Sequence, residues 1–431
     1  MQTKNNLNKI FLFVGLVILT FTGNTQQVFP VNLETVLKLS GANNLTVKEY
    51  QLKYQMAIAE HAKAKEWWLP TVYAGASTHY LAGAAMNTDG HIFTDVKQTN
   101  IWAGLGINVE IDFGKGFYQV LAAKQNAQAA HYYSLAERNK TILQAVSNYF
   151  DLQSSQLKYV FLQQLVMQSD TLTQQIKIQV DAGIRYQSEY LLSQSNFNHL
   201  KISLLQAKLE WQKSSAILTS LLNLNKNTRL ISADTTLVAI EFNAQEIDTA
   251  GFKTRPEYDG LTAELQSLQT SKKTVNQGLL LPALRVGLDN GAFGGYTTQL
   301  NNTYQYNASL LWKLPFGRLT YKGDIKRYNA QIDVKKNAID QFKNQYQKEI
   351  AMANTGLELT SQQMEIAKQA LQISTEAMGQ SIERQKLQTA KPFEVFQAQQ
   401  FLLQSQVDYL NVVVSYNKAQ FELKVAKGEL L

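Results

Sequence analysis

Several things are missing from this sequence, and each absence excludes a class of protein. The 431 residues contain no cysteine, which excludes disulfide bonds, thiolate metal sites, a cysteine nucleophile and lipidation of an N-terminal cysteine. Only 6 prolines are present, so very long helices are allowed, because proline removes a backbone donor and clashes inside a helix. Charged residues make up 17%, below the roughly 25% of a soluble globular chain, which suits a surface that is partly outside water.

The net charge does not indicate a nucleic-acid partner. The 41 Lys and Arg against 34 Asp and Glu give a net charge of +7, which favours anionic partners in general. No run rich in Lys and Arg concentrates this charge, as a nucleic-acid-binding surface requires.

The motifs of common enzymes are incomplete or absent. The triplet Asp112-Phe113-Gly114 spells a kinase metal-binding motif, but neither a His-Arg-Asp loop nor a phosphate-covering glycine loop accompanies it. The 5 histidines lack the spacing of a zinc site, and the sequence has neither a Gly-x-Ser-x-Gly elbow nor a phosphate loop. We therefore expect no enzymatic activity, no metal site and no cofactor.

The N-terminus has the pattern of a secretory signal peptide. Lys4 and Lys9 precede the apolar run 10–21, and small and polar residues follow as far as Thr25. The apolar run is too short to span a bilayer, and no later stretch reaches about 18 apolar residues. We expect residues 1–25 to be removed on export, leaving a chain with no helical and no lipid anchor. The alternative is a buried N-terminal helix.

One pattern of helices and strands occurs twice. In the first copy, residues 26–225, the elements are expected at about 33–67 (helix), 71–81 and 100–112 (strands), 117–181 and 188–225 (helices). In the second copy, residues 255–431, they are expected at about 256–281 (helix), 283–289 and 303–314 (strands), 319–385 and 392–427 (helices). Residues 226–254 are predicted to connect the copies. Gly114 and Gly116 are expected to turn the chain from strand into helix.

The four strands have the length and alternation of membrane-crossing strands. Each has about ten residues with one apolar face, and aromatic residues stand near the ends. The residues expected to face lipid are Ile101, Ala103, Leu105, Ile107, Val109, Leu284, Val286, Leu288, Tyr304, Tyr306, Leu310 and Trp312. The alternative is a soluble four-stranded sheet packed on the helices.

Four strands in lipid cannot remain an open sheet. The unpaired backbone groups of two open edges cost several kcal/mol each in hydrocarbon. The membrane interpretation therefore predicts an oligomer whose subunits share one barrel. Two copies give eight strands, and three give twelve strands with room for a lumen.

The residues at the start of each copy resemble those of TolC-like outer membrane efflux proteins. The resemblance rests on Leu33–Leu39, Asn43-Asn44, Trp68–Thr71 and Arg255–Tyr258, together with the Phe-Gly turns and the duplicated order. It implies an α+β membrane protein, a homotrimer in which long antiparallel helical hairpins form an α-barrel in the periplasm. Four transmembrane strands per chain complete a 12-stranded β-barrel in the outer membrane.

The resemblance also implies a function and partners. Such channels are exit ducts of tripartite efflux or type I secretion systems, and they conduct substrates from a periplasmic adaptor and an inner-membrane pump to the exterior. The rival hypothesis is a secreted or periplasmic coiled-coil scaffold or adaptor with a soluble sheet. Only a pore needs a continuous apolar band, so solubility without detergent distinguishes the two.

Residues at the helical tips are assigned from the resemblance. Glu189 and Glu394 fall where the family has gate carboxylates; Gln397 replaces a second acidic position. Ala390 replaces a basic latch residue, so a latch here uses groups such as Arg185 or Lys391. A glutamate near a helix start is also an ordinary partner of the helix dipole. The predicted adaptor contacts are Gly183, Ile184, Arg185, Leu387 and Gln388.

Overall fold

A computed structural model describes residues 27–87, 89–242, 251–296, 298–313, 315–387 and 389–430. The predicted signal peptide lies outside these residues. The chain forms two compact units, and each unit takes segments from both sequence copies. Of the described residues, unit 1 contains 27–48, 137–242, 251 and 347–430, and unit 2 contains those within 49–136 and 252–346.

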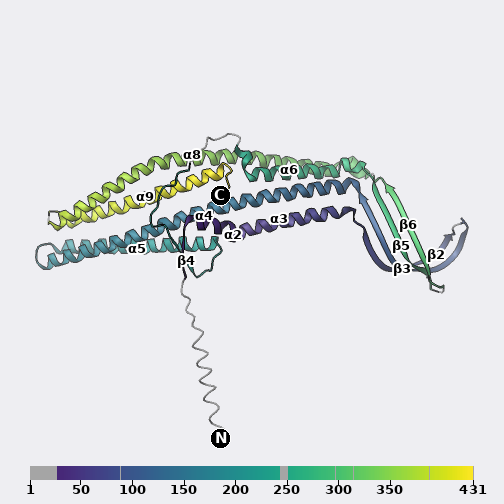
Figure 1. The fold of residues 1–431 in the computed structure, drawn as a ribbon, viewed down its shortest axis with the longest axis horizontal. Helices are drawn as coiled ribbons and strands as arrows, with labels where there is room; N and C mark the ends of the chain where they lie inside the picture. The colour runs from purple at the N-terminus through teal and green to yellow at the C-terminus, as the bar shows by residue number, and fades with distance from the viewer. Residues whose placement is uncertain are drawn as a thin grey trace, which may run out of the picture. The chain divides into compact units, whose positions relative to one another are not determined.

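Unit 1 is built around two helical hairpins (Figure 1). The first is the later part of α4 (Phe113–Asp181) with α5 (Gln187–Leu221), and the second is the later part of α8 (Gly323–Lys386) with α9 (Pro392–Ala426). The short helix α2 (Leu33–Asn43) and a parallel pair of strands, β1 (Gln27–Val31) and β4 (Thr228–Ser232), complete the unit.

Large apolar side chains of unit 1 form its main core. They come from β1, α2, α4, α5, β4 and α9, so the strand pair joins both hairpins. Buried members include Val36, Phe150, Leu218, Leu230 and Phe421. Because full burial of such a side chain contributes about 1.5–3 kcal/mol, this cluster is the principal stabilising element of the unit.

A hydrogen bond from Tyr149 connects α4 to the segment after β4. The Tyr149 hydroxyl donates to the Asp234 carboxylate and lies 3.3 Å from the Ser232 hydroxyl. Burial, followed by the hydrogen bond to Asp234, raises the pKa of Tyr149 well above its ordinary value. The tyrosine therefore stays neutral and keeps donating throughout the physiological range.

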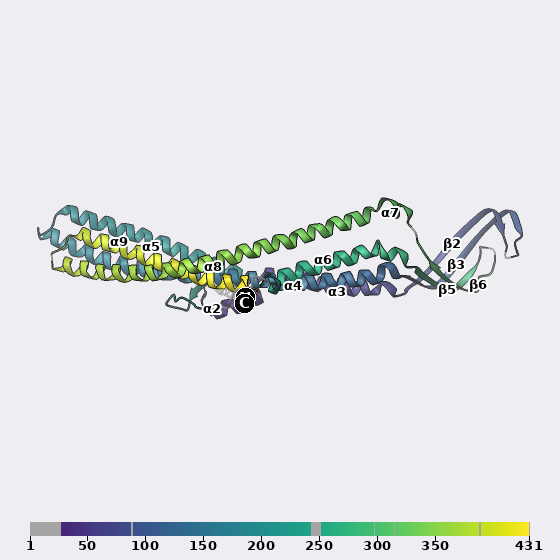
Figure 2. The ribbon, with the colours of Figure 1, turned by 90° about the horizontal axis from the view of Figure 1, so that it is seen from above.

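Unit 2 contains the four-stranded antiparallel sheet (Figure 2). The spatial order is β2, β3, β5, β6, with β2 at Thr71–Met86, β3 at Ile92–Asp112, β5 at Ala283–Gly295 and β6 at Asn301–Leu311. The helices of unit 2 are most of α3 (Leu45–Ala64), the start of α4, α6 (Pro256–Thr274), α7 (Phe316–Tyr321) and the start of α8. Short 3-10 turns lie at Lys65–Trp68 (η2), Gly251–Thr254 (η3) and Gln277–Leu280 (η4).

The helical part of unit 2 has a small core. Its buried apolar residues are mostly alanine: Ala122, Ala127, Ala129, Ala136, Ala263, Ile332, Ile339 and Tyr346. A polar contact adds to it, because Glu264 accepts a hydrogen bond from Tyr133 at 2.7 Å and from Lys335 at 2.6 Å. Burial and the bond to Glu264 raise the pKa of Tyr133. No helix among the described residues is both long enough and apolar enough to cross a membrane.

Two helices expected to be continuous are interrupted. The helix expected over 33–67 breaks at Asn44, whose amide group donates to the Leu221 carbonyl at 2.7 Å. Its side-chain oxygen accepts from Thr46 and Val47 and so caps α3. The helix expected over 319–385 breaks at Lys322, which has a φ of +51° and separates α7 from α8.

The strands also differ from their expected limits. β2, β3 and β5 extend beyond the expected ranges, because pairing continues through polar and glycine positions where the apolar alternation fades. β6 ends at Leu311, earlier than expected. The segment 226–254 contains β4, which was not predicted, and its residues 243–250 lie outside the described ranges.

The interpretation of Gly114 and Gly116 as a turn is wrong. Both lie inside the first turn of α4. A Cβ on Gly114 would overlap the carbonyl oxygen of Gly278, and a Cβ on Gly116 would overlap the Trp67 ring. The helix expected from about 117 therefore begins at Phe113, and these glycines permit close packing of its start against η4 and η2.

Candidate functional site

The register of the sheet brings the predicted lipid-facing residues onto one face. Residues directly opposite each other in antiparallel strands share a face, and Ile107 pairs with Leu288, which pairs with Tyr306. The same parity applies along β3, β5 and β6, so Ile101 to Val109, Leu284 to Leu288 and Tyr304 to Leu310 lie together on alternate positions. Trp312 follows β6 with the same parity and is 58% exposed. We call this surface the apolar face.

The opposite surface, the polar face, carries glycines, hydroxyls and charges. Tyr73, Gly106 and Asp289 stand opposite one another on β2, β3 and β5. The Tyr73 ring lies over Gly106, where any side chain would overlap it, and its hydroxyl donates to the Asp289 carboxylate. The small residue on the central strand thus lets an aromatic ring bridge three strands.

A charged cluster lies on the same polar face near the helical end of the sheet. The Glu110 carboxylate accepts from Arg285 on β5 and from Lys313 after β6, both at 3.0 Å. Charge-assisted hydrogen bonds therefore connect β3 with β5 and with the segment after β6.

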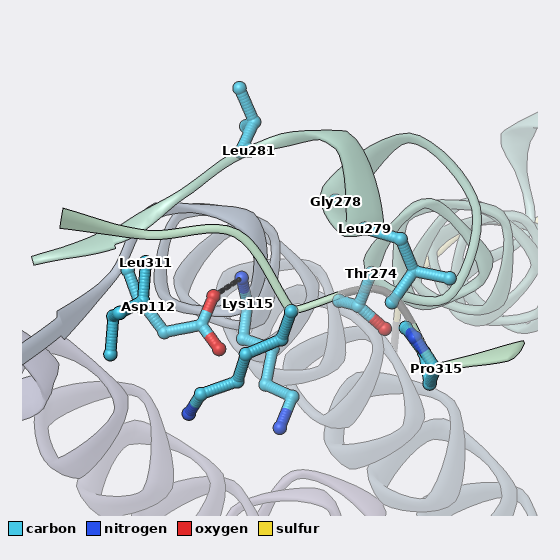
Figure 3. Close-up of a pocket in the computed structure, with 10 residues that line it drawn as sticks. Asp112, Lys115, Thr274, Gly278, Leu279, Leu281, Leu311 and Pro315 are labelled. Atoms are coloured by element: carbon cyan, nitrogen blue, oxygen red, sulfur yellow. Dashed lines mark hydrogen bonds between the residues drawn. The ribbon is translucent and has the colours of Figure 1, made fainter.

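A small cavity marks the junction between sheet and helices in unit 2 (Figure 3). It has a volume of about 170 Å³ and is lined by Asp112, Lys115, Thr274, Gly278, Leu279, Leu281, Ala283, Leu311, Lys313 and Pro315. Asp112 accepts from the backbone nitrogen of Lys115 at 3.0 Å and so caps α4. The aspartate of the kinase-like triplet therefore has a structural partner in its own helix.

The first helical tip is the turn between α4 and α5. Gly183 has a φ of +72°, and the Ile184 nitrogen donates to the Gln179 carbonyl at 2.8 Å, as in a helix-ending turn of Schellman type. Ile184 is 59% exposed and Tyr186 79% exposed. The turn therefore presents two large apolar side chains to solvent.

Arg185 connects this tip to the second one. Its side chain is only 10% exposed; it donates from Nε to Gln179 at 2.6 Å and from one terminal nitrogen to Glu189 at 3.3 Å. The other terminal nitrogen lies 3.4 Å from the carbonyl oxygen of Ala390, in the turn between α8 and α9. A single guanidinium group therefore spans both hairpin ends.

At the second tip, Glu394 forms an ion pair with a residue that the sequence did not suggest. Glu394 pairs with Arg384 at 3.1 Å, and both side chains are about half exposed. Arg384 could have been suspected from its place in the last turn of α8, where a cation also stabilises the helix dipole. The structure thus pairs each predicted gate glutamate with an arginine.

The other predicted tip residues lie near these pairs. Gln397 and Lys391 are exposed, and Lys391 precedes α9, where its carbonyl accepts from the Glu394 nitrogen at 3.0 Å. Leu387 is 72% exposed. Gln388 lies outside the described residues. Beneath the tips, Gln399 is buried and accepts from Asn196 at 2.9 Å, a contact that the sequence analysis missed.

Comparison of the chain with models of known protein families gives one match. The family model of outer membrane efflux proteins matches residues 36–224, which include the first strand pair and the first helical hairpin. No curated protein matches the chain.

Solved structures match over most of the chain. The outer-membrane channel OprN has 16% identity and a TM-score of 0.77, over 92% of this chain and 89% of that one. The CmeC outer membrane channel of Campylobacter jejuni has 18% identity and a TM-score of 0.76, over 92% and 85%. The MtrE outer membrane channel of Neisseria gonorrhoeae, in its open state, has 14% identity and a TM-score of 0.76, over 92% and 89%. The resemblance found in the sequence is confirmed, and the chain has the mostly helical fold of these channels.

Proposed function

We propose, from the likeness of this chain to TolC-like outer membrane efflux proteins, that it forms the exit duct of a tripartite efflux or type I secretion system. Three copies assemble, and their hairpins of strands close a 12-stranded barrel in the outer membrane of a Gram-negative-type bacterium. The helices continue the duct into the periplasm. There a periplasmic adaptor connects the duct to an inner-membrane pump.

The two-faced sheet is the observation that carries this proposal. Its apolar face suits lipid, and its polar face suits a water-filled lumen. β2 and β6 each have one unpaired edge in the sheet of four strands. Because unpaired backbone groups are costly in hydrocarbon, the edges of neighbouring copies are the partners that close the barrel.

Exposed apolar residues on the helices support assembly as well. On α8 they recur every seven residues, at Met352, Leu359, Ile366 and Ile373, and each is at least 50% exposed. A seven-residue repeat is the spacing of a helix seam in a coiled coil. With the small core of unit 2, this stripe indicates helices that pack against further copies.

The helical tips supply the proposed gate and adaptor surface. Arg185 and Glu189 at the first tip, and Glu394, Gln397 and Lys391 at the second, line the periplasmic entrance. The exposed turns, including Gly183, Ile184 and Leu387, contact the adaptor.

One recording tests the channel. The purified full-length protein is reconstituted in a planar bilayer, and its size in detergent is measured before and after heating. We expect steps of current and a trimer that dissociates on heating. A protein that is monomeric, soluble without detergent and silent in the bilayer is instead the scaffold considered from the sequence.

Removing the second-tip glutamate gives a more specific prediction. Three copies of Glu394 concentrate negative potential at the entrance, so Glu394→Ala should raise single-channel conductance or reduce the preference for cations. Conductance and reversal potential in a potassium chloride gradient measure both effects. Glu383→Ala is the control, because Glu383 lies in the same region and pairs only with nearby Lys386 among described contacts. Unchanged current and selectivity would remove Glu394 from the gate.

The two faces of β3 are tested by one pair of substitutions. Leu105→Arg places a charge on the apolar face, where a cation costs roughly 2–4 kcal/mol near the bilayer midplane. Asn108→Arg places the same charge on the polar face of the same strand. We expect Leu105→Arg to reduce the yield of folded protein in vesicles at least tenfold and Asn108→Arg to leave it nearly unchanged. Equal yields contradict the assignment of the faces.

A further inference from the structure

The excess positive charge of the chain is concentrated immediately after the sheet. Residues 313–336 contain seven Lys and Arg against two Asp, a net charge of +5 out of +7 for the whole chain. Apolar residues separate these cations, so no contiguous basic run appears in the sequence. The expectation that the sequence has no run rich in Lys and Arg still holds, but this segment as a whole is basic.

Large aromatic and apolar side chains accompany the charge. Trp312 is 58% exposed, Phe316 75%, Leu319 44% and Tyr321 82%. They lie where the chain leaves β6 and forms α7 (Figure 2). Exposed aromatic residues next to cations are typical of a segment at the boundary between hydrocarbon and lipid headgroups.

A polar cavity lies between the end of α6 and the start of α8. Its volume is about 540 Å³, and its lining residues are Gln269, Lys272, Lys273, Asn276, Gln277, Asn329, Ile332, Asp333 and Lys336. Three lysines and one aspartate give this lining a net charge of +2. Asn276 and Gln277 add amide groups that can donate to an anion.

The ion pairs of unit 2 leave two of these lysines available. Lys335 is held by Glu264 at 2.6 Å, and Lys336 pairs with Asp333 at 3.4 Å. No carboxylate among the described residues pairs with Lys272 or Lys273. Both lie in the last turn of α6, where cations stabilise the helix dipole, and Lys336 lines the same cavity from α8.

We infer that this cavity binds the phosphate-bearing headgroup of an anionic glycerophospholipid. Lys272, Lys273 and Lys336 surround the phosphate, while the aromatic residues after β6 lie at the same membrane boundary. The inference rests on the proposed function, because it requires the sheet to lie in the membrane and the helices to begin at its periplasmic surface. The occupant is a lipid of the bilayer, since Gln277 of the cavity lining lies only six residues before β5 begins, with the exposed Leu280 and Leu281 between them.

Lipid binding by the full-length protein tests the site. The protein in detergent, stripped of lipid, is titrated with phosphatidylglycerol or phosphatidylcholine, and bound lipid is counted by native mass spectrometry. The test variant carries Lys272→Gln, Lys273→Gln and Lys336→Gln. The control carries Lys177→Gln, Lys208→Gln and Lys213→Gln, three exposed lysines of unit 1 with the same change of charge.

We expect the parent and the control to prefer phosphatidylglycerol, and the test variant to lose affinity about tenfold or more. Equal loss in both variants, or no preference in the parent, overturns the site. If inorganic phosphate binds as tightly as phosphatidylglycerol, the lipid is not the occupant of the cavity.

The test variant should still conduct in a phosphatidylcholine bilayer. Conduction without lipid preference refutes only this inference, whereas the absence of any channel refutes the proposed function.

Discussion

Replacing Arg185 with alanine is expected to open the proposed entrance at the helical tips. The substitution removes contacts to Gln179, Glu189 and the Ala390 carbonyl from a side chain that is only 10% exposed. Hydrogen bonds to charged groups contribute about 1.5–3 kcal/mol each, and a loss of about 3 kcal/mol changes an equilibrium by roughly a hundredfold. We expect mean conductance of the reconstituted channel to rise severalfold or more.

A second arginine at the tips provides the matched control for this prediction. The ion pair between Arg384 and Glu394 lies near the surface, because both side chains are about half exposed. Such exposed pairs contribute about 1 kcal/mol or less to stability. Arg384→Ala should therefore change conductance much less than Arg185→Ala. Melting curves of both variants test whether either has simply lost its fold. If the two substitutions raise conductance equally, Arg185 is not the link that holds the tips.

The alternation of the strands could be predicted because it follows from local geometry. Successive side chains of a strand point to opposite faces, so Leu105 and Ile107 had to share a face as soon as the region was taken as a strand. The pairing of Ile107 with Leu288 agrees with this expectation across two distant segments. The long helices could also be predicted, because few prolines interrupt the second half of each copy.

Features that depend on distant contacts could not be predicted. The break at Asn44 arises because its side chain reaches the Leu221 carbonyl, 177 positions away. The pairing of β1 with β4 joins short strands that carry no clear alternation. At the tips, the sequence placed Arg185 near Glu189, but the contacts to Ala390 and between Arg384 and Glu394 depend on how the two hairpins pack.

Corresponding glycines of the two sequence copies have different surroundings in the structure. Gly114 and Gly317 both follow a phenylalanine at the start of a helix, so the sequence treats them alike. A Cβ on Gly114 would overlap the backbone of Gly278, whereas a Cβ on Gly317 meets nothing within 4 Å. The duplication therefore conserves the motif in both copies while only the first uses it for close backbone packing.

This difference predicts opposite effects of the same substitution. Gly114→Ala forces two backbone segments apart, and since overpacking alone costs about 1–3 kcal/mol and backbone yields less than a side chain, we expect a loss at or above that range. Gly317→Ala adds a methyl group to an exposed helical position and should stabilise by up to about 1 kcal/mol. Urea unfolding of the protein in detergent micelles, with resistance of the proposed trimer to heating, measures both.

The stabilities of these variants distinguish a packing role of Gly114 from a need for its backbone flexibility. If Gly114 were needed only for backbone flexibility, its replacement in a helical turn would be harmless, and the two variants would unfold at similar urea concentrations. Gly278→Ala provides a reciprocal check, because its Cβ would overlap the Gly114 carbonyl. Loss of stability in Gly114→Ala and Gly278→Ala, with none in Gly317→Ala, identifies the contact of α4 with η4 as the joint that fixes the helices of unit 2 to the sheet.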